Sequence, residues 1–323
     1  MAAWGWVGAG LIALLSVWGH LPARLSPAGI EPFALPVEVE RVAADAEANV
    51  RRWQDLLRQA KAEAGVPPGG DSGFDPSGLL GEELTPLVTT LGSLEAKRLT
   101  TNPAWARVLA RQLARHDLRR GDVVAASYSG SFPALNLALV AACEALGARL
   151  VAVSSVTSST WGANQAGFTW PEIEARLVAA GEIERVTVAV TAGGEADVAS
   201  DLEPEAQAVA RRTAAEAGQR LGVPVLVPAG FEDAVERRLD AYERAAAGGR
   251  IALYVNVGGA HASLGRSPAV LKLRNGFVPG VPFDRSADRG VTARFAERRV
   301  KILMLLNVRE LALTWGVPLA GRK

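Results

Sequence analysis

The stretch Val123-Val-Ala-Ala-Ser-Tyr-Ser-Gly-Ser-Phe-Pro-Ala-Leu-Asn136 carries the clearest structural signal in the chain. Its first four residues are apolar and predict a strand, whereas Pro133 and the apolar positions after it predict a helix. A loop between the carboxyl end of a strand and the amino end of a helix presents backbone N–H groups, and here it adds serine hydroxyls. The sequence therefore predicts a site for an anion such as phosphate or carboxylate, with these candidate residues: Ser129, Gly130, Ser131 and Asn136.

A second loop of the same kind follows the strand-like run Ile251–Val257 and reads Asn256-Val-Gly-Gly-Ala-His-Ala-Ser-Leu-Gly265. Its glycines allow a close approach of the backbone to a ligand or to a neighbouring loop. We expect the two loops to converge into one pocket, to which this loop contributes Asn256, Gly258, Gly259 and Ser263. His261 would need a hydrogen-bonding partner to act as a general base, and the sequence identifies none.

From residue 81 onward, apolar runs alternate with helical patterns, which predicts an α/β domain over residues 81–323. The runs lack polar alternation, so we expect a mainly parallel sheet with helices on both faces. Ligands bind such sheets at the carboxyl ends of the strands. The predicted strands are Asp122–Ala126, Arg149–Ser154, Arg185–Thr191, Val223–Val227, Ile251–Val257 and Val300–Leu305.

Four further residues are candidates for ligand contact, and three of them lie at this edge of the sheet. Ser155 ends the second predicted strand, and Trp161 and Asn164 follow it in a loop. A tryptophan used only for packing is the alternative for that loop. Lys97 lies at helical spacing from Thr89, Thr90 and Ser93 and either neutralises a bound carboxylate or phosphate or is a solvated helix lysine.

The amino-terminal part of the chain predicts a membrane anchor over residues 1–23. Residues 2–19 carry no charge, and 18 helical residues would rise about 27 Å, close to the thickness of a bilayer core. A cleaved signal peptide is the alternative. Residues 24–80 predict a connector with an amphipathic helix at Val37–Ala64, either a stalk or a helix packed on the domain, which we favour because Trp53 calls for burial.

The bulk composition excludes several classes of function. The chain has 323 residues with 35 basic and 34 acidic side chains, so no global charge attracts nucleic acid. Cys143 is the only cysteine, which excludes an intrachain disulfide, and we expect it in the core. No spaced cluster of histidines and carboxylates indicates a metal, and no motif indicates a cofactor.

Two families share motifs with this chain. The segment Gly121–Ser155 resembles the sugar-isomerase domain, whose serine-rich loop holds a sugar phosphate. A longer likeness joins Glu83-Leu-Thr-Pro86, Thr89–Arg98, Thr101-Asn-Pro103, Ser129–Asn136, Trp161-Gly-Ala-Asn164, Phe168-Thr-Trp170, Asn256-Val-Gly-Gly259, Ala262-Ser-Leu-Gly265 and Leu306–Ala312. In combination these motifs resemble the poly-gamma-glutamate system protein family.

The second resemblance implies a place in the synthesis and export machinery of a cell-surface polymer. It implies partners in a membrane and in that machinery, and it supplies no reaction. The leading hypothesis is a membrane-anchored accessory component that binds a small anionic ligand at the serine and glycine loops, with its soluble domain outside the membrane. The alternative is an enzyme, either sugar-phosphate isomerase-like or a serine amidohydrolase. A purely structural scaffold is the third possibility.

Overall fold

The computed structural model describes residues 35–73, 75–267, 274–278 and 289–319. The predicted anchor, residues 1–23, lies outside them. Among the described helices, none is both long enough and apolar enough to cross a bilayer. The described residues from 36 onward form one compact unit, which includes the amphipathic helix and the segment up to residue 80 that we expected to precede the domain.

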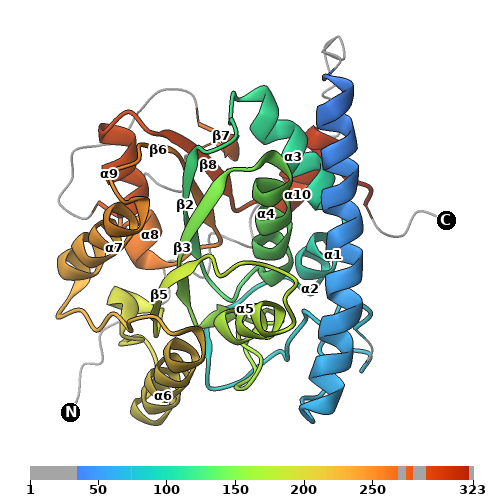
Figure 1. Cartoon of the computed structure of the whole chain (residues 1–323). Helices are drawn as coiled ribbons and strands as arrows, with labels where there is room; N and C mark the ends of the chain where they lie inside the picture. The colour runs from blue at the N-terminus through green and yellow to red at the C-terminus, as the bar shows by residue number, and fades with distance from the viewer. Residues whose placement is uncertain (1–34, 74, 268–273, 279–288, 320–323) are drawn as a thin grey trace, which may run out of the picture. The chain divides into compact units, whose positions relative to one another are not determined.

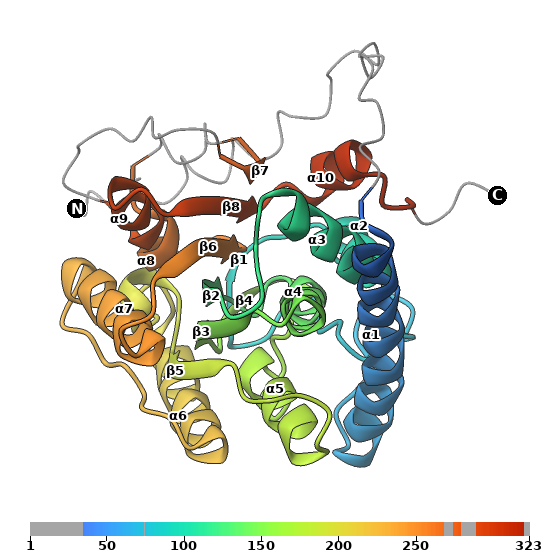
Figure 2. The ribbon, with the colours of Figure 1, turned by 45° about the horizontal axis from the view of Figure 1, so that its top comes forward.

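A six-stranded sheet organises the fold, in the order β5-β3-β2-β6-β8-β7 (Figures 1 and 2). Every pair in it is parallel except β7 with β8. The strands are β2 (Val123–Tyr128), β3 (Arg149–Ser155), β5 (Thr187–Thr191), β6 (Ile251–Val257), β7 (Gly276–Phe277) and β8 (Lys301–Leu305). The predicted α/β class with a mainly parallel sheet is confirmed.

Helices cover both faces of this sheet, as the apolar strands required. One face is covered by α3, α4 and α5, with α1 packed against these helices, and the other by α7, α8 and α9, on the opposite side in Figure 2. α6 packs beside β5. The helices are α1 (Val37–Glu63), α2 (Leu94–Thr100), α3 (Ala104–Arg115), α4 (Pro133–Leu146), α5 (Trp170–Ala179), α6 (Pro204–Leu221), α7 (Phe231–Ala246), α8 (His261–Leu264), α9 (Val291–Glu297) and α10 (Val308–Trp315).

The amphipathic helix α1 packs on the domain and is no free stalk. Its apolar stripe, which includes Val50, Trp53 and Leu57, is fully buried in the same core as α3 and α4. The indole N–H of Trp53 donates to Glu182 at 3.0 Å, and Arg52 donates to the same carboxylate oxygen at 2.7 Å. The expectation that Trp53 is buried is confirmed.

Two local predictions were wrong. The run Val223–Val227 is no strand and makes only an isolated bridge between Val225 and Val190, because Pro224 and Pro228 lack the N–H groups that a continued ladder needs. The residues around Thr89 do not extend the helix of Lys97. They form β1 (Val88–Thr90), which pairs with β4 (Ser158–Ser159), and Ser93 caps α2 by accepting a hydrogen bond from the Ala96 N–H.

The order of the strands places a topological switch beside β2. The chain runs from β2 to β3 to β5 on one side, then returns to β6 on the other side of β2 and continues to β8. In open parallel sheets the crevice at such a switch, outside the carboxyl ends of the strands, is where ligands bind. The loops that follow β2 and β6 are the two that the sequence singled out.

Candidate functional site

The two predicted loops meet at the carboxyl edge between β2 and β6. Tyr128 pairs with Val257 at the ends of the two strands. Gly258 follows with φ of +86°, and a Cβ atom at that position would lie 2.5 Å from Ser129 Oγ and 3.4 Å from Ser131 Cβ. Only glycine fits there, because both the backbone conformation and the contact exclude a side chain. The two loops therefore meet as expected, and the pocket that they would form together stays a prediction.

A third segment, residues 157–164, closes the serine loop from the other side. The Gly130 N–H donates to the Thr157 carbonyl at 3.0 Å, and the Ala163 N–H donates to the Gly130 carbonyl at 2.8 Å. Ser131 Oγ accepts a hydrogen bond from the Ser159 N–H at 3.1 Å. Three loops that are far apart in sequence therefore form one edge of hydroxyl and amide groups.

Lys97 of α2 reaches into this edge and is buried, with 2% of its surface exposed. Its ammonium donates to Ser159 Oγ at 2.7 Å and to the carbonyl of Ser131, and it lies 4.1 Å from the centre of the Phe132 ring. Gly92 packs against the Lys97–Ser159 contact, where a Cβ would lie 3.0 Å from Ser159 Oγ. The alternative of a solvated lysine is wrong.

The charge of Lys97 has no acidic partner among the described residues. Burial lowers the pKa of its ammonium to about 7, and no neighbouring carboxylate offsets this. Lys61 is the informative contrast. Burial lowers the pKa of Lys61 only to about 8, because Asp75 and Glu82 favour its charged form. Lys97 is thus a buried cationic centre that lacks a counter-ion.

Two asparagines next to Ser129 keep one polar atom free. Asn136 Nδ2 donates to the Ser129 carbonyl at 3.0 Å, and Asn256 Nδ2 donates to the Gly258 carbonyl at 2.6 Å. Both side chains are fully buried, and the Oδ1 atom of each has no hydrogen-bond partner in the described part of the chain. These oxygens can accept hydrogen bonds from a ligand N–H or from water.

Other predicted site residues hold loops together. Asn164 is fully buried and bonds the backbone of Glu82 twice, through Oδ1 at 3.0 Å and through Nδ2 at 2.6 Å. Trp161, with φ of +65°, is half-buried and bonds Gly81 and Glu82 through its backbone. Both residues fix the segment 157–164 against residues 81–82, so the side chain of Asn164 is fully engaged within the protein.

The remaining predicted residues line the rest of the edge. Ser155 Oγ donates to the Tyr128 carbonyl at 3.0 Å, and Ser263 Oγ donates to the Ala260 carbonyl at 3.0 Å. Gly259 is exposed, and a Cβ atom built there would lie near the side chains of Leu264 and Leu306. His261 begins the short helix α8, and its buried Nδ1 has no hydrogen-bond partner among the described residues. No described carboxylate makes a hydrogen bond or ion pair with it that would support a role as a base.

A buried polar network underlies the switch point. Arg238 of α7 is fully buried and donates to both oxygens of Asp197, at 2.5 and 2.7 Å, and to Ser127 Oγ at 3.3 Å. Ser127 Oγ also lies 2.9 Å from the Tyr242 hydroxyl and 2.8 Å from the Tyr254 hydroxyl. The network therefore ties Ser127, the last-but-one residue of β2, to α7 and to the neighbouring strand β6, and leaves it no free hydroxyl for a ligand.

The same network holds a strained loop against the site. Residues Ala196, Asp197 and Ala199 all have positive φ, between +52° and +62°, in the segment that follows β5. Such conformations cost free energy, which the buried contact of Arg238 with Asp197 offsets. Gly193 in this segment sits against Ser155, since a Cβ there would lie 2.7 Å from Ser155 Cβ.

Sequence reasoning missed Ser159 and Arg238. Ser159 is one of several hydroxyl residues in a row after β3, and nothing local distinguishes it from its neighbours. Arg238 follows another arginine on an amphipathic helix, where the usual expectation is a solvated side chain. Their roles depend on contacts across 62 and 41 positions, to Lys97 and Asp197 respectively.

Comparisons with known proteins found no relative of this chain. No family model matches the chain, and neither a similar curated protein nor a similar solved structure was found. The described residues also contain no group of three or more histidine, cysteine, aspartate or glutamate side chains arranged to hold a metal ion. The candidate site therefore consists of hydroxyl groups, amide groups and one buried lysine.

Proposed function

We propose that this chain is a membrane-anchored accessory component of a poly-gamma-glutamate system that binds an anionic ligand at the β2/β6 edge. The buried ammonium of Lys97, which has no counter-ion among the described residues, carries the proposal. A buried charge is costly unless it is paired, so a carboxylate next to the serine loop would offset the cost. The resemblance to the poly-gamma-glutamate family supports the polymer as the source of that carboxylate.

The free Asn136 and Asn256 oxygens agree with a γ-glutamyl ligand. Each repeat of such a polymer carries one carboxylate and one amide N–H. Lys97 and the serine hydroxyls suit the carboxylate, and the unpaired Oδ1 atoms suit the N–H group. An inorganic anion has no N–H group to offer these two oxygens.

Calorimetric titration of the full chain with a short γ-linked glutamate oligomer at neutral pH tests this function. We expect the Lys97→Met variant to bind about ten- to a hundredfold more weakly, since it loses a buried charge-assisted contact. Lys61→Met is the matched control, because Lys61 is also buried but already has nearby carboxylates. An α-linked oligomer of the same length separates γ-glutamyl recognition from general anion binding. Equal affinity of the wild type and Lys97→Met would reject the site.

A serine amidohydrolase is the second candidate, and it is favoured by the 2.7 Å contact between Lys97 Nζ and Ser159 Oγ. A lysine with a pKa of about 7 is partly unprotonated at neutral pH. It could accept the Ser159 proton as that oxygen adds to an amide carbonyl. The loop serines are weaker candidates for the nucleophile than Ser159. Ser129 Oγ lies 3.5 Å from a backbone carbonyl, and Ser131 Oγ accepts a hydrogen bond from a backbone N–H.

The two candidate functions differ in whether the purified chain cleaves its ligand. The amidohydrolase predicts release of new amino groups from γ-linked oligomers by the purified chain, and loss of this release in Ser159→Ala. The binding component predicts that no amino groups are released and that Ser159→Ala retains part of the affinity. For the isomerase alternative, no carboxylate among the described residues contacts Ser129, Gly130 or Ser131 to serve as a base.

A further inference from the structure

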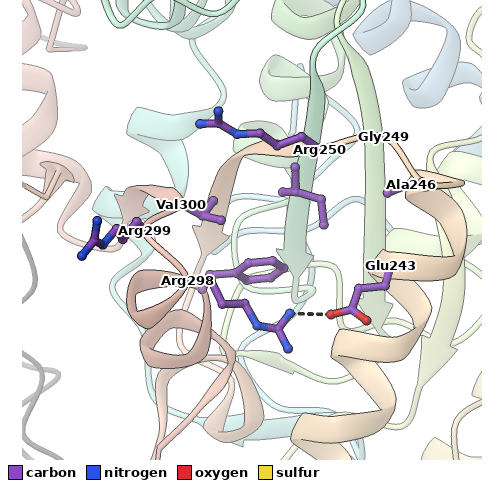
Figure 3. Close-up of a pocket in the computed structure, with 10 residues that line it drawn as sticks. Glu243, Ala246, Gly249, Arg250, Arg298, Arg299 and Val300 are labelled. Atoms are coloured by element: carbon purple, nitrogen blue, oxygen red, sulfur yellow. Dashed lines mark hydrogen bonds and ion pairs between the residues drawn. The ribbon is translucent and has the colours of Figure 1, made fainter.

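A cavity lies at the opposite end of the sheet from the candidate site. It has a volume of about 560 Å³ and opens at the amino ends of β6 and β8, between the last turns of α7 and α9 (Figure 3). Its lining combines the apolar side chains of Ile251 and Phe295 with three arginines: Arg250, Arg298 and Arg299. This arginine pocket has no part in the function proposed above.

The arginine pocket carries an excess of positive charge. Arg298 forms an ion pair with Glu243 at 2.5 Å, the dashed contact in Figure 3. Arg250 and Arg299 are exposed, and no described carboxylate lies within ion-pair distance of either. Figure 3 shows their guanidinium groups directed away from Glu243. Two cations are therefore available to an anionic partner.

A neighbouring cavity of about 370 Å³ shares Arg250 and extends the basic surface to the ends of α3 and β7. Lys301 there pairs with Asp117 at 3.6 Å, and Asp122 accepts the backbone N–H of Arg119. The two cavities together are lined by five basic and three acidic side chains: Arg119, Arg250, Arg298, Arg299 and Lys301, with Asp117, Asp122 and Glu243.

The chain enters the compact unit at this same end. Glu40 in the first turn of α1 forms an ion pair with Arg111, near the end of α3, and α3 ends at the second cavity. Figure 1 shows α1 beginning at the end of the molecule where α3 ends and β2 begins. The preceding residues 2–19 carry no charge. The basic surface thus lies beside the start of the described chain.

We propose that the arginine pocket and its basic rim dock on the phosphate groups of an anionic membrane surface. Arg250 and Arg299 would each contact a lipid phosphate, and guanidinium groups suit phosphate because they can donate two parallel hydrogen bonds. A few such contacts are weak alone, but the amino-terminal anchor of the proposed function, on which this inference rests, would give them a high effective concentration. The edge of the sheet at the amino ends of β6 and β8 would then face the membrane. The candidate site with Lys97 would lie at the opposite edge.

Hydrogen–deuterium exchange of the full chain in lipid bilayers tests this docking. One bilayer is neutral phosphatidylcholine, and the other contains about a quarter phosphatidylglycerol. We expect amides 248–252 and 298–302 to exchange about three- to tenfold more slowly in the anionic bilayer. We expect this protection to disappear in about 0.5 M salt, because surface charge is screened. Equal exchange in the two bilayers would overturn the proposal.

The double variant Arg250→Gln/Arg299→Gln should lose the protection in anionic bilayers while it keeps its melting temperature and γ-glutamyl binding. Arg211→Gln/Arg212→Gln on α6 is the matched control, since it removes two exposed arginines elsewhere. Protection in the first variant equal to that of the wild type rejects the arginine pocket as the contact. Protection by inorganic phosphate in detergent micelles, equal to that in anionic bilayers, shows a site for free phosphate and rejects the membrane.

Discussion

At the scale of the residue, Lys97 is the group whose environment departs most from what its sequence neighbours suggest. The sequence offered it as a counter-charge for a bound carboxylate or phosphate or as a solvated helix lysine, and only the first alternative agrees with its contact with Ser131. Its burial could not be predicted, since that depends on Phe132 and Ser159, which come from other parts of the chain. For Asn164 the sequence prediction differs from the structure. Its position in a loop predicted contact with a ligand, but its side chain makes hydrogen bonds with the backbone of Glu82.

The lowered pKa of Lys97 makes stability depend on pH in a defined direction. Between pH 7 and pH 10 the folded chain loses the Lys97 proton while the unfolded chain keeps it, so the free energy of unfolding rises with pH. From a pKa of about 7, the rise between pH 7 and pH 9 is about 2 kcal/mol. Urea unfolding at several pH values measures it, with Lys97→Met as the reference that lacks this rise. The same pH profile in both proteins would contradict the buried charge.

Gly258 provides a test of the contact between the two loops. Gly258→Ala places a Cβ atom 2.5 Å from Ser129 Oγ at a residue with φ of +86°, so we expect a loss of about 2–4 kcal/mol in the free energy of unfolding. Gly222→Ala is the matched control, because Gly222 has φ of +64° and open space around it. Urea denaturation should show the smaller loss, about 1 kcal/mol, for the control. Equal losses would mean that the loops do not touch there.

At the scale of the element, the apolar runs predicted the central strands well. β6 begins and ends where expected, and β2 and β3 differ by one or two residues at an end, because their apolar residues are buried between two helical layers. The short strands β1, β4 and β7 were not predicted. Two or three residues carry no periodicity, and each of these strands exists only through its pairing partner.

The packing of α1 leads to a prediction about its contribution to stability. Trp53→Ala should lower the free energy of unfolding by about 3–5 kcal/mol, because Trp53 is fully buried against α3 and α4. Val37→Ala on the same helix is the control and should change it by less than about 0.5 kcal/mol, since Val37 is 87% exposed. Chemical denaturation of both variants measures the difference. A stalk that only joins an anchor to the domain would make the two losses alike.

At the scale of the whole molecule, the two edges of the sheet have different chemistry. The carboxyl edge joins hydroxyls, amides and a buried lysine at the topological switch, and the amino edge gathers exposed arginines around two cavities. The parallel order of the strands, which the sequence pattern predicted, is what separates them. The strand order itself, and with it the switch beside β2, became visible only from the pairing of β2 with β6.

Proton uptake on ligand binding tests the role of Lys97 most directly. At pH 7 about half of the Lys97 side chains are protonated, and a bound carboxylate raises the pKa, so binding draws a proton from solution. Titration of the full chain with a γ-glutamyl oligomer in buffers of different ionisation enthalpy measures this uptake. We predict about half a proton per site in the wild type and none in Lys97→Met. Binding without proton uptake, or with the same uptake in both proteins, would contradict a carboxylate paired with Lys97.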